Sequence, residues 1–112
     1  MAKKNTLTNE HQQLARLAKA MSHPVRIYVL ELLSHQSCCY SGDLSEELPI
    51  AKSTLSQHLK ELKNAGLIQG EIDAPKIKYC LNREVWELAQ TVFREFFNKK
   101  TGVTIDDSNA CS

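Results

Sequence analysis

Two adjacent cysteines, Cys38 and Cys39, stand out among the side chains that could do chemistry, in the stretch HQSCCYSGD. The other two cysteines of the chain are Cys80 and Cys111. Thiolates bind soft metal ions and are the form of cysteine that oxidants attack. In a reducing compartment, such cysteines are more often free thiols, metal ligands or redox sensors than a disulfide framework. The thiols therefore predict a thiophilic ion site or a redox sensor, with buried, inert cysteines as the plain alternative.

The composition predicts one small cytoplasmic domain. A chain of 112 residues is long enough for one modest core and too short for two ordinary domains. Its net charge of +1 means that any attraction for nucleic acid must come from local clustering. No apolar run reaches the roughly 18 residues of a membrane span, and MAKKNTLTNEHQQ lacks the apolar segment of a secretory signal. We therefore expect a cytoplasmic protein with no membrane partner.

The sequence predicts a mainly helical fold, and this fold must position the thiols. Apolar residues at helical spacing predict helices from residue 9 to about 21, in PVRIYVLELL, in AKSTLSQHLKELKNAG, and in REVWELAQTVFREFFNKK after the cap Asn82. Asp43 can cap a further short acidic helix in LSEELP. We expect residues 1–100 to form a single domain and the polar residues 101–112 a mobile tail.

Three short β-rich runs interrupt the helices. SCCY reads as a brief strand, and LIQGEI and IKYCL read as the two strands of an antiparallel hairpin joined by DAPK. The hairpin carries Lys76 and Lys78. A short helix, a tight turn, a second helix and a basic hairpin follow one another in the order of a winged helix-turn-helix.

The helix in AKSTLSQHLKELKNAG is the most informative segment for function. Leu55, Leu59 and Leu62 recur at i, i+4 and i+7 and would bury one face. The opposite face carries hydroxyl, amide and ammonium groups, on Ser53, Ser56, Gln57, Lys60, Lys63 and Asn64. Hydroxyl and amide groups can bind base edges in a major groove, and lysines beyond them can bind phosphates. On spacing alone a solvated amphipathic helix is the commoner explanation, and the order of the elements is what favours DNA binding.

AMSHPVRIYVLELL and GDLSEELPIAKSTLSQHLKELKNAGLI resemble the corresponding segments of the ArsR/SmtB repressors. These are small dimeric winged-helix proteins that release DNA when they bind a metal or metalloid. The resemblance implies a mainly α fold with a small β wing, a homodimer, and a repressor of double-stranded operator DNA rather than an enzyme. Carried over by position, the DNA-reading residues fall on Lys52, Ser53, Ser56 and Gln57, and His58 matches a histidine common in the motif. For His58, a contact that stabilises the helix is an equal alternative.

This chain departs from the family pattern at the start of the DNA-reading helix. The family usually has a serine there as the helix cap, whereas this chain has Ala51. The departure puts the local cap in question and leaves the fold unchanged.

The resemblance also implies a role for the cysteines. Many zinc sensors of this type use Asp and His on the last helix, but all four histidines here precede it. Arsenic-responsive members place cysteines just ahead of the helix-turn-helix, and CCYSGDL looks like a shifted version of that arrangement, with Cys39 the best match. Trivalent arsenic, As(III), commonly takes three thiolates, so Cys38 and Cys39 would need Cys80 or Cys111 as a third ligand.

The fold implied by the resemblance limits this set of ligands. In a winged helix of this type, the SCCY strand pairs with the returning strand of the wing, which would place it beside KYC. Successive strand residues face opposite ways, so Cys38 and Cys39 cannot both face Cys80 in a regular sheet.

Three alternatives to the arsenic hypothesis stay open at this point. The inducer could be Sb(III), Cd(II) or Pb(II), and some family members switch instead as thiol redox or persulfide sensors. The hypothesis from another class is an enzyme with Cys38 or Cys39 as nucleophile and His35 as base. That hypothesis lacks a third orienting group at a recognisable spacing, and little chain is left to form a substrate pocket.

Two apolar stripes predict the homodimer independently of the resemblance. The stripe on the first helix consists of Leu14, Leu17 and Met21. The stripe on the last helix consists of Val85, Leu88, Val92 and Phe96. Together they offer more apolar surface than one domain of this size can cover.

Overall fold

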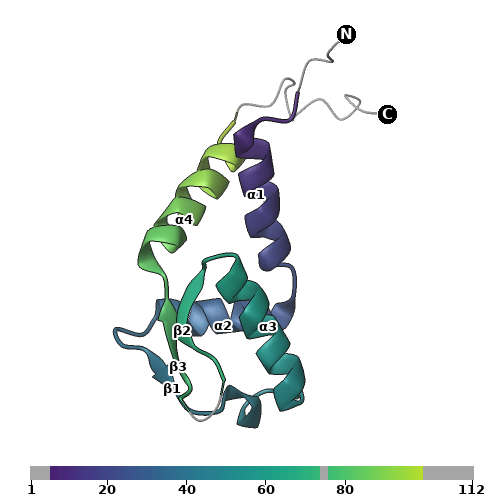
Figure 1. The fold of residues 1–112 in the computed structure, drawn as a ribbon. Helices are drawn as coiled ribbons and strands as arrows, with labels where there is room; N and C mark the ends of the chain where they lie inside the picture. Colours follow the sequence, from purple (N-terminus) through teal and green to yellow (C-terminus); the bar gives the residue numbers. More distant parts are fainter. Residues whose placement is uncertain (1–5, 74–75, 100–112) are drawn as a thin grey trace, which may run out of the picture.

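The computed structural model describes residues 6–73 and 76–99 of the chain (Figure 1). The elements follow in the order α1 (Asn9–Ala20), α2 (Pro24–Ser34), β1 (Tyr40–Ser41), the 3₁₀ turn η1 (Leu44–Glu46), α3 (Lys52–Asn64), β2 (Ile68–Glu71), β3 (Lys78–Leu81) and α4 (Arg83–Phe97). The predicted fold, mainly helical with a small antiparallel wing, is confirmed. The predicted tail, residues 101–112, lies outside the described residues.

The helices begin and end where local chemistry favours it. Pro24 is the first residue of α2, where a missing N–H costs nothing, and the side chain of Asn82 caps α4 by accepting from the Val85 N–H. Gly66, just after α3, has φ +83°, a left-handed conformation that glycine adopts without strain. The cap of α1 was not predicted: Thr8 and His11 form a reciprocal capping box, in which each side chain accepts from the other's N–H.

The three strands form one antiparallel sheet with the order β1-β3-β2. The predicted hairpin is β2 and β3, in which Gly70 pairs with Tyr79. The predicted pairing of the first strand with the returning strand of the wing is also present, because Tyr40 pairs with Tyr79 and Ser41 with Lys78. Gly70 has φ +116°, and a Cβ there would overlap the backbone of Lys78, so this position of the wing requires glycine.

Two expected elements differ from the structure. The strand expected at SCCY lies at Tyr40–Ser41, because the chain bends at Ser37 and Cys38 as it leaves α2 and reaches β3 only afterwards. The short helix expected in LSEELP is a single 3₁₀ turn, η1, capped as predicted by Asp43. Pro49 disfavours helical backbone in the residue before it, which leaves too few residues for an α-helix.

The core lies where α2, η1 and α3 meet the sheet. Its most deeply buried side chains are Val29, Leu30, Leu33, Leu44, Leu62, Leu67, Ile68 and Tyr79. Each such side chain contributes about 1.5–3 kcal/mol through removal from water. α1 and α4 contact each other and extend away from this core (Figure 1). The core therefore holds α3 and the wing, while α1 and α4 form a separate arm.

Within the two described ranges, no helix is long and apolar enough to cross a membrane.

We expect Ala51→Ser to stabilise the protein. Ala51 is the cap residue of α3 with extended backbone (φ −72°, ψ 154°), and it makes no side-chain hydrogen bond to the first turn. A serine hydroxyl there can accept a hydrogen bond from an N–H of that turn, which typically adds about 0.5–2 kcal/mol. Urea unfolding followed by circular dichroism measures the change. Ala51→Gly is the control, and equal stabilities of the serine variant and the wild type would contradict this account of the cap.

Candidate nucleic-acid interface and thiol site

α3 presents a polar face to solvent and an apolar face to the core. Leu55, Leu59 and Leu62 are buried, as their spacing predicted. On the other side, Ser53, Gln57 and Lys60 are exposed. Ser56 is half-buried, and its hydroxyl lies 3.5 Å from a carboxylate oxygen of Asp73 on the wing. The outer face of α3 therefore holds hydrogen-bonding groups at its N-terminal half and an ammonium group beyond them.

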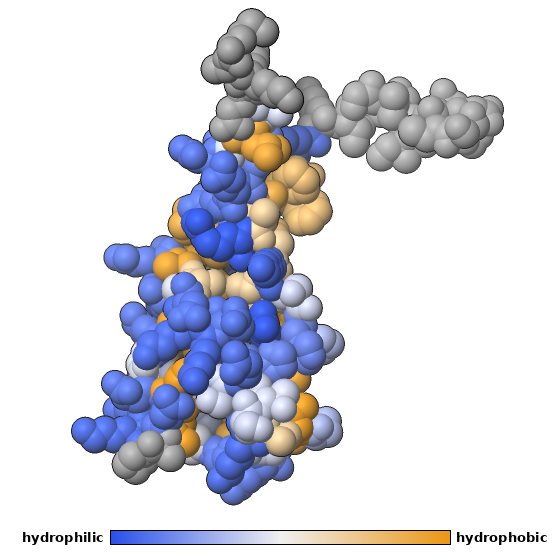
Figure 2. Space-filling model, turned by 45° about the vertical axis from the view of Figure 1, so that its right-hand side comes forward, coloured by the Kyte–Doolittle hydropathy of each residue, from blue (hydrophilic) through white to orange (hydrophobic). Residues whose placement is uncertain are grey.

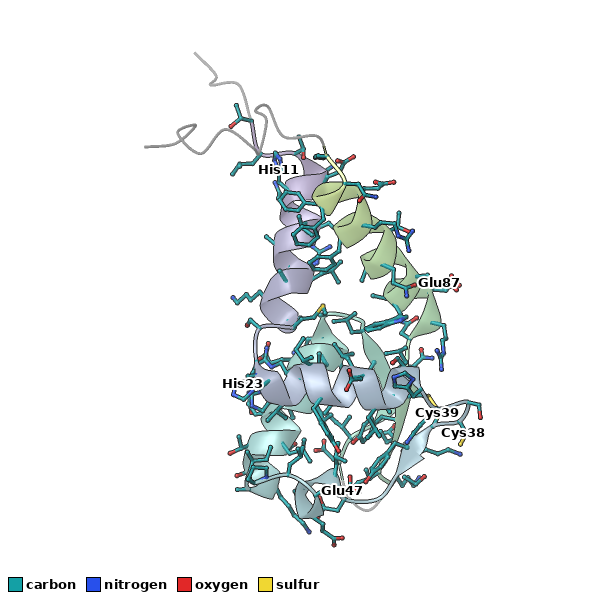
Figure 3. The ribbon with its side chains drawn as sticks, turned by 180° about the vertical axis from the view of Figure 1, so that it is seen from behind. His11, His23, Cys38, Cys39, Glu47 and Glu87 are labelled. Atoms are coloured by element: carbon teal, nitrogen blue, oxygen red, sulfur yellow. A yellow bond between two sulfur atoms is a disulfide. The ribbon has the colours of Figure 1, made fainter. Side chains whose placement is uncertain are left out.

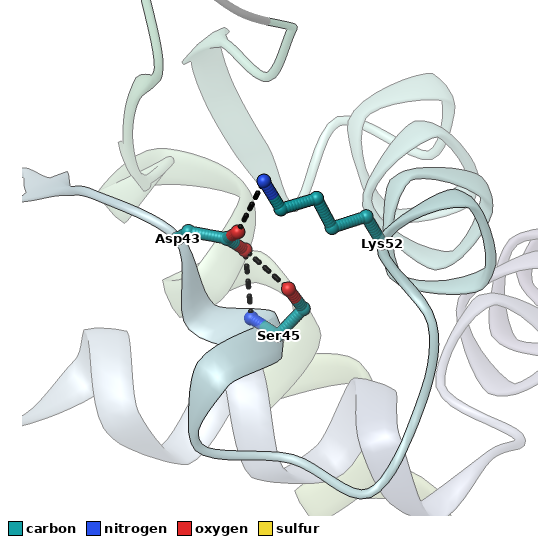
Figure 4. Close-up of polar contacts among 3 residues, drawn as sticks. All are labelled: Asp43, Ser45 and Lys52. Atoms are coloured by element: carbon teal, nitrogen blue, oxygen red, sulfur yellow. Dashed lines mark hydrogen bonds and ion pairs between the residues drawn. The ribbon is translucent and has the colours of Figure 1, made fainter.

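An ion pair fixes the start of α3 (Figure 4). Lys52 Nζ lies 3.0 Å from Asp43 Oδ2, while Asp43 Oδ1 accepts hydrogen bonds from the backbone N–H and the hydroxyl of Ser45. The Ser45 hydrogen bond and the ammonium of Lys52 lower the pKa of Asp43 below its usual value. The same pairing raises the pKa of Lys52. Asp43 thus joins η1 to the first residue of the predicted DNA-reading helix.

The remaining lysines predicted to contact DNA lie on α3 and the wing. Lys76 and Lys78 are exposed on the wing. Lys63 is exposed too, but its Nζ donates to the Gly70 carbonyl oxygen at 2.7 Å. Lys63 therefore ties the end of α3 to β2.

His58 lies on the inner face of α3, in contact with α2. It is 9% exposed, and its Nδ1 accepts a hydrogen bond of 2.9 Å from Arg26 Nε. The His23 ring lies with its centroid 4.1 Å from that of His58. Burial, followed by the neighbouring His23 and Arg26, lowers the pKa of His58 below 6.5. Of the two roles considered for His58, this position favours the contact that stabilises the helix.

The structure brings two of the predicted thiol residues together and leaves a third apart. Cys39 and Cys80 form a disulfide across β1 and β3, with a Cα–Cα distance of 4.3 Å. Cys38 is free and exposed on the bend before β1 (Figure 3). Cys39, directly before β1, is thus the cysteine of the adjacent pair that meets Cys80, and Cys38 does not. Cys111 lies outside the described residues.

No metal site is assembled in the part of the chain that the structure describes. Nowhere in residues 6–73 and 76–99 do three His, Cys, Asp or Glu side chains lie close enough together to hold a metal ion. Cys39 and Cys80 would be two adjacent thiol ligands once their disulfide is reduced. A third thiolate would have to come from Cys38, after a change in the bend, or from Cys111.

Two contacts and one unpaired group in this region were not predicted from the sequence. The Arg26–His58 hydrogen bond joins residues 32 positions apart, and the Asp43–Lys52 pair depends on how η1 turns. The hydroxyl of Tyr79 is buried without a partner among the described residues. Only Asp43 carried a usable signal, because a carboxylate ahead of a helical turn is a common cap.

The chain is similar to known regulatory proteins over most of its length. The family described as "Bacterial regulatory protein, arsR family" matches residues 23–69. The chain is 38% identical over 73 residues to the HTH-type transcriptional regulator YgaV of Escherichia coli (strain K12), covering 65% of this chain and 74% of that protein. It is 30% identical over 103 residues to the arsenical resistance operon repressor of Staphylococcus xylosus, covering 90% of each.

A solved structure agrees with these sequence matches. The cadmium metal-sensor CMTR from Mycobacterium tuberculosis superimposes with a TM-score of 0.50 at 27% identity, covering 88% of this chain and 96% of that chain. The relatives share the fold, and their names point to different inducers.

We expect the stability of the protein to fall as the pH decreases below about 6.5, in part through His58. The folded state binds a proton at His58 less readily than the unfolded state, because its pKa is lowered on folding. The contribution of His58 is therefore complete above pH 6.5 and is lost as the pH falls toward the folded pKa. Urea unfolding at about pH 7.5 and pH 5 measures this dependence.

His58→Asn tests the assignment, because an amide oxygen can accept from Arg26 and does not titrate. We expect a smaller loss of stability between the two pH values than in the wild type. His35→Asn, at the exposed end of α2, is the matched control and should keep the wild-type dependence. If the stability of His58→Asn changes with pH as much as that of the wild type, other groups cause the pH dependence.

Proposed function

We propose that this chain, which belongs to the ArsR family of bacterial regulatory proteins, is a repressor that releases operator DNA when trivalent arsenic or antimony binds its cysteines. Its family makes it a DNA-binding transcriptional regulator and not an enzyme. The observation that carries the inducer proposal is the direct contact of Cys39 and Cys80 between β1 and the wing. The arsenical resistance operon repressor, similar over 90% of the chain, supports the same inducer.

The DNA-binding surface in this proposal is the outer face of α3 together with the wing. Ser53, Ser56 and Gln57 supply groups that bind base edges. The phosphate contacts come from lysines, namely Lys52, Lys60, Lys63, Lys76 and Lys78. Two of these have partners in the free protein, Lys52 with Asp43 and Lys63 with Gly70, and would exchange them for phosphates. His58 is assigned to holding α3 on α2, given its buried hydrogen bond to Arg26.

The inducer site in this proposal is built on Cys39 and Cys80 after a small-molecule thiol reduces their disulfide by exchange and is itself oxidised to a disulfide. Each thiol loses its proton when it bonds to the soft ion, and the third thiolate is Cys38 or Cys111. Cys39 lies only four residues before Asp43, whose carboxylate holds Lys52 at the start of α3. A change in the position of β1 on binding would thus be transmitted through Asp43 to the DNA-reading helix.

A redox-sensing repressor of the same fold is the second candidate. The observation that favours it is the disulfide itself, which joins Cys39 and Cys80 with a Cα–Cα distance of 4.3 Å. In that case a hydroperoxide or a persulfide accepts the two electrons that the thiols lose when the S–S bond forms. Cd(II) or Pb(II) binding at the same thiols is the other form that the ion-sensing proposal can take.

We propose that the functional form is a homodimer joined through α1 and α4. Leu17 of α1 and Ala89 of α4 belong to the buried core cluster, but Leu88 is 42%, Phe96 45% and Phe97 73% exposed. Figure 2 shows apolar surface in the upper part of the molecule, where the arm lies. A twofold dimer would place two copies of α3 one turn of DNA apart, or a multiple of it, on an inverted repeat.

The two kinds of DNA contact predict two kinds of mutant behaviour. We expect Gln57→Ala to lose discrimination between operator and random DNA, because an amide binds base edges. Lys60→Ala should weaken binding to both DNAs and reduce the slope of log affinity against log salt by about one unit. Fluorescence anisotropy with DNA from upstream of its own gene measures both effects. Lys99→Ala, just beyond the end of α4, is the control. Identical behaviour of the Gln57 and Lys60 variants would refute this orientation of α3.

The thiol proposal predicts the loss of induction without the loss of DNA binding. We expect Cys39→Ser and Cys80→Ser to bind operator DNA as the wild type does and to resist release by arsenite at least tenfold better, because each removes one thiolate ligand. Anisotropy titrations of DNA-bound, reduced protein with arsenite measure the release. Cys38→Ser and Cys111→Ser then identify the third ligand.

The same variants separate the ion-sensing and redox candidates. If hydroperoxide releases DNA from the wild type under conditions where arsenite does not, the redox candidate replaces the arsenic proposal. A Cys39/Cys80 double variant that still releases DNA at the wild-type arsenite concentration would exclude this pair as the sensor.

A further inference from the structure

An open groove of about 520 Å³ lies between the end of α1, the start of α2 and the end of α3. The charged side chains that line it are three cations and one carboxylate, namely Arg16, Lys19, Arg26 and Glu61. Ser22 and Asn64 add a hydroxyl and an amide to the lining. The groove therefore concentrates positive charge in a chain whose net charge is only +1.

The two cations that α1 contributes are exposed and have no acidic partner. Arg16 and Lys19 are three residues apart, so they lie on the same side of the helix. In residues 6–73 and 76–99 the structure contains one ion pair, which joins Lys52 to Asp43. Glu61 therefore neutralises neither cation of α1 by direct contact. Adjacent cations without partners attract anions to such a groove.

The third cation, Arg26, is held in a fixed position by hydrogen bonds. Its Nη1 donates to the carbonyl oxygen of Ala20 at 3.2 Å and to that of Lys19 at 3.4 Å, at the end of α1. Its Nε donates to His58 Nδ1 on α3. One guanidinium on α2 thus connects the end of α1 to α3, and this connection sets where the cations of α1 lie relative to the DNA-reading helix.

The groove continues the polar face of α3. Asn64 lines the groove and lies on the same stripe of the helix as Ser53, Gln57 and Lys60, at i, i+4, i+7 and i+11. Asn64 is about 16 Å from Ser53 along the helix axis, whereas the major groove of B-DNA is only about 12 Å wide. With the N-terminal half of α3 on base edges, the end of α3 would therefore lie at the edge of the major groove, beside backbone phosphates. Figure 2 shows hydrophilic surface along this side of the molecule, up to the base of the arm.

We propose that this groove binds the DNA backbone, and that Arg16 and Lys19 of α1 are phosphate-binding residues outside the helix-turn-helix. Both precede residues 23–69, the segment that matches the arsR family, so the family pattern does not assign them a role. The inference rests on the DNA-binding function of the chain and extends its DNA contacts to α1. Arg26 supplies a fixed positive charge at the same place and positions α1 against α3.

Arg16→Ala and Lys19→Ala test the proposal in the full-length protein. We expect each to weaken binding to operator and random DNA alike by about three- to tenfold, and to reduce the slope of log affinity against log salt by about one unit. Both DNAs are affected because phosphates carry no sequence information. Fluorescence anisotropy between about 50 and 200 mM NaCl measures both quantities. Arg94→Ala, an exposed arginine of α4 outside the groove, removes the same charge and should leave both unchanged.

Glu61→Gln should act in the opposite direction. The carboxylate of Glu61 lines the groove and repels phosphates, so its replacement by an amide should strengthen binding to both DNAs by about two- to fivefold. Misfolding cannot produce a gain in affinity. This variant therefore keeps the test decisive if the alanine variants are destabilised.

A neutral methylphosphonate in place of one phosphate at a time identifies the contact itself. At the phosphate bound by Lys19, this replacement should weaken binding of the wild type and leave Lys19→Ala unaffected, because that contact is already lost. The proposal is overturned if Arg16→Ala and Lys19→Ala bind DNA as the wild type does, if Arg94→Ala weakens binding as much as they do, or if Glu61→Gln weakens it. In each of these cases the wild type still binds its operator, so the DNA-binding function is unaffected; only a wild type that fails to bind DNA would contradict both.

Discussion

The pairing of both β1 and β2 with the central strand β3 is the constraint on which the rest of the structure depends. β1 immediately precedes η1 and α3, and β2 immediately follows α3. The whole helix-turn-helix segment is therefore a loop closed at both ends on one strand. Because β3 also carries Tyr79 into the core and Lys78 to the surface, its register determines at once where the wing, the core and the start of α3 lie.

The same strand explains why two chemically different features lie near α3. Cys80 and Tyr79 are neighbours on β3, so their side chains point to opposite faces of the sheet. Cys80 meets Cys39 on one face, and Tyr79 is buried in the core on the other. A ligand or an oxidant at the thiols would thus act on the strand that holds the two ends of the helix-turn-helix.

The sequence predicted the features that depend on local chemistry. The leucines of α3 at helical spacing, Pro24 at the start of α2 and Asn82 before α4 all act over a turn of helix or less, and the structure confirms them. That only one of the two adjacent cysteines meets Cys80 agrees with the expectation from the sequence, although both lie just before β1 and not in a regular strand. The disulfide partner, the Arg26–His58 hydrogen bond and the unpaired hydroxyl of Tyr79 were beyond prediction, because each depends on the register or packing of elements far apart in the chain.

In the proposed mechanism, a small change at the thiols is sufficient to control DNA binding. A tenfold change in operator affinity corresponds to about 1.4 kcal/mol of coupling, which is comparable with the net contribution of one or two hydrogen bonds. The path from Cys39 to α3 runs through the Asp43 hydrogen bonds to Ser45 and the ion pair of Asp43 with Lys52. α3 has no side-chain cap of its own at Ala51, and the ion pair of Asp43 with Lys52 links its first residue to η1. The absence of the usual cap residue therefore makes the position of α3 depend more closely on the segment that follows the cysteines.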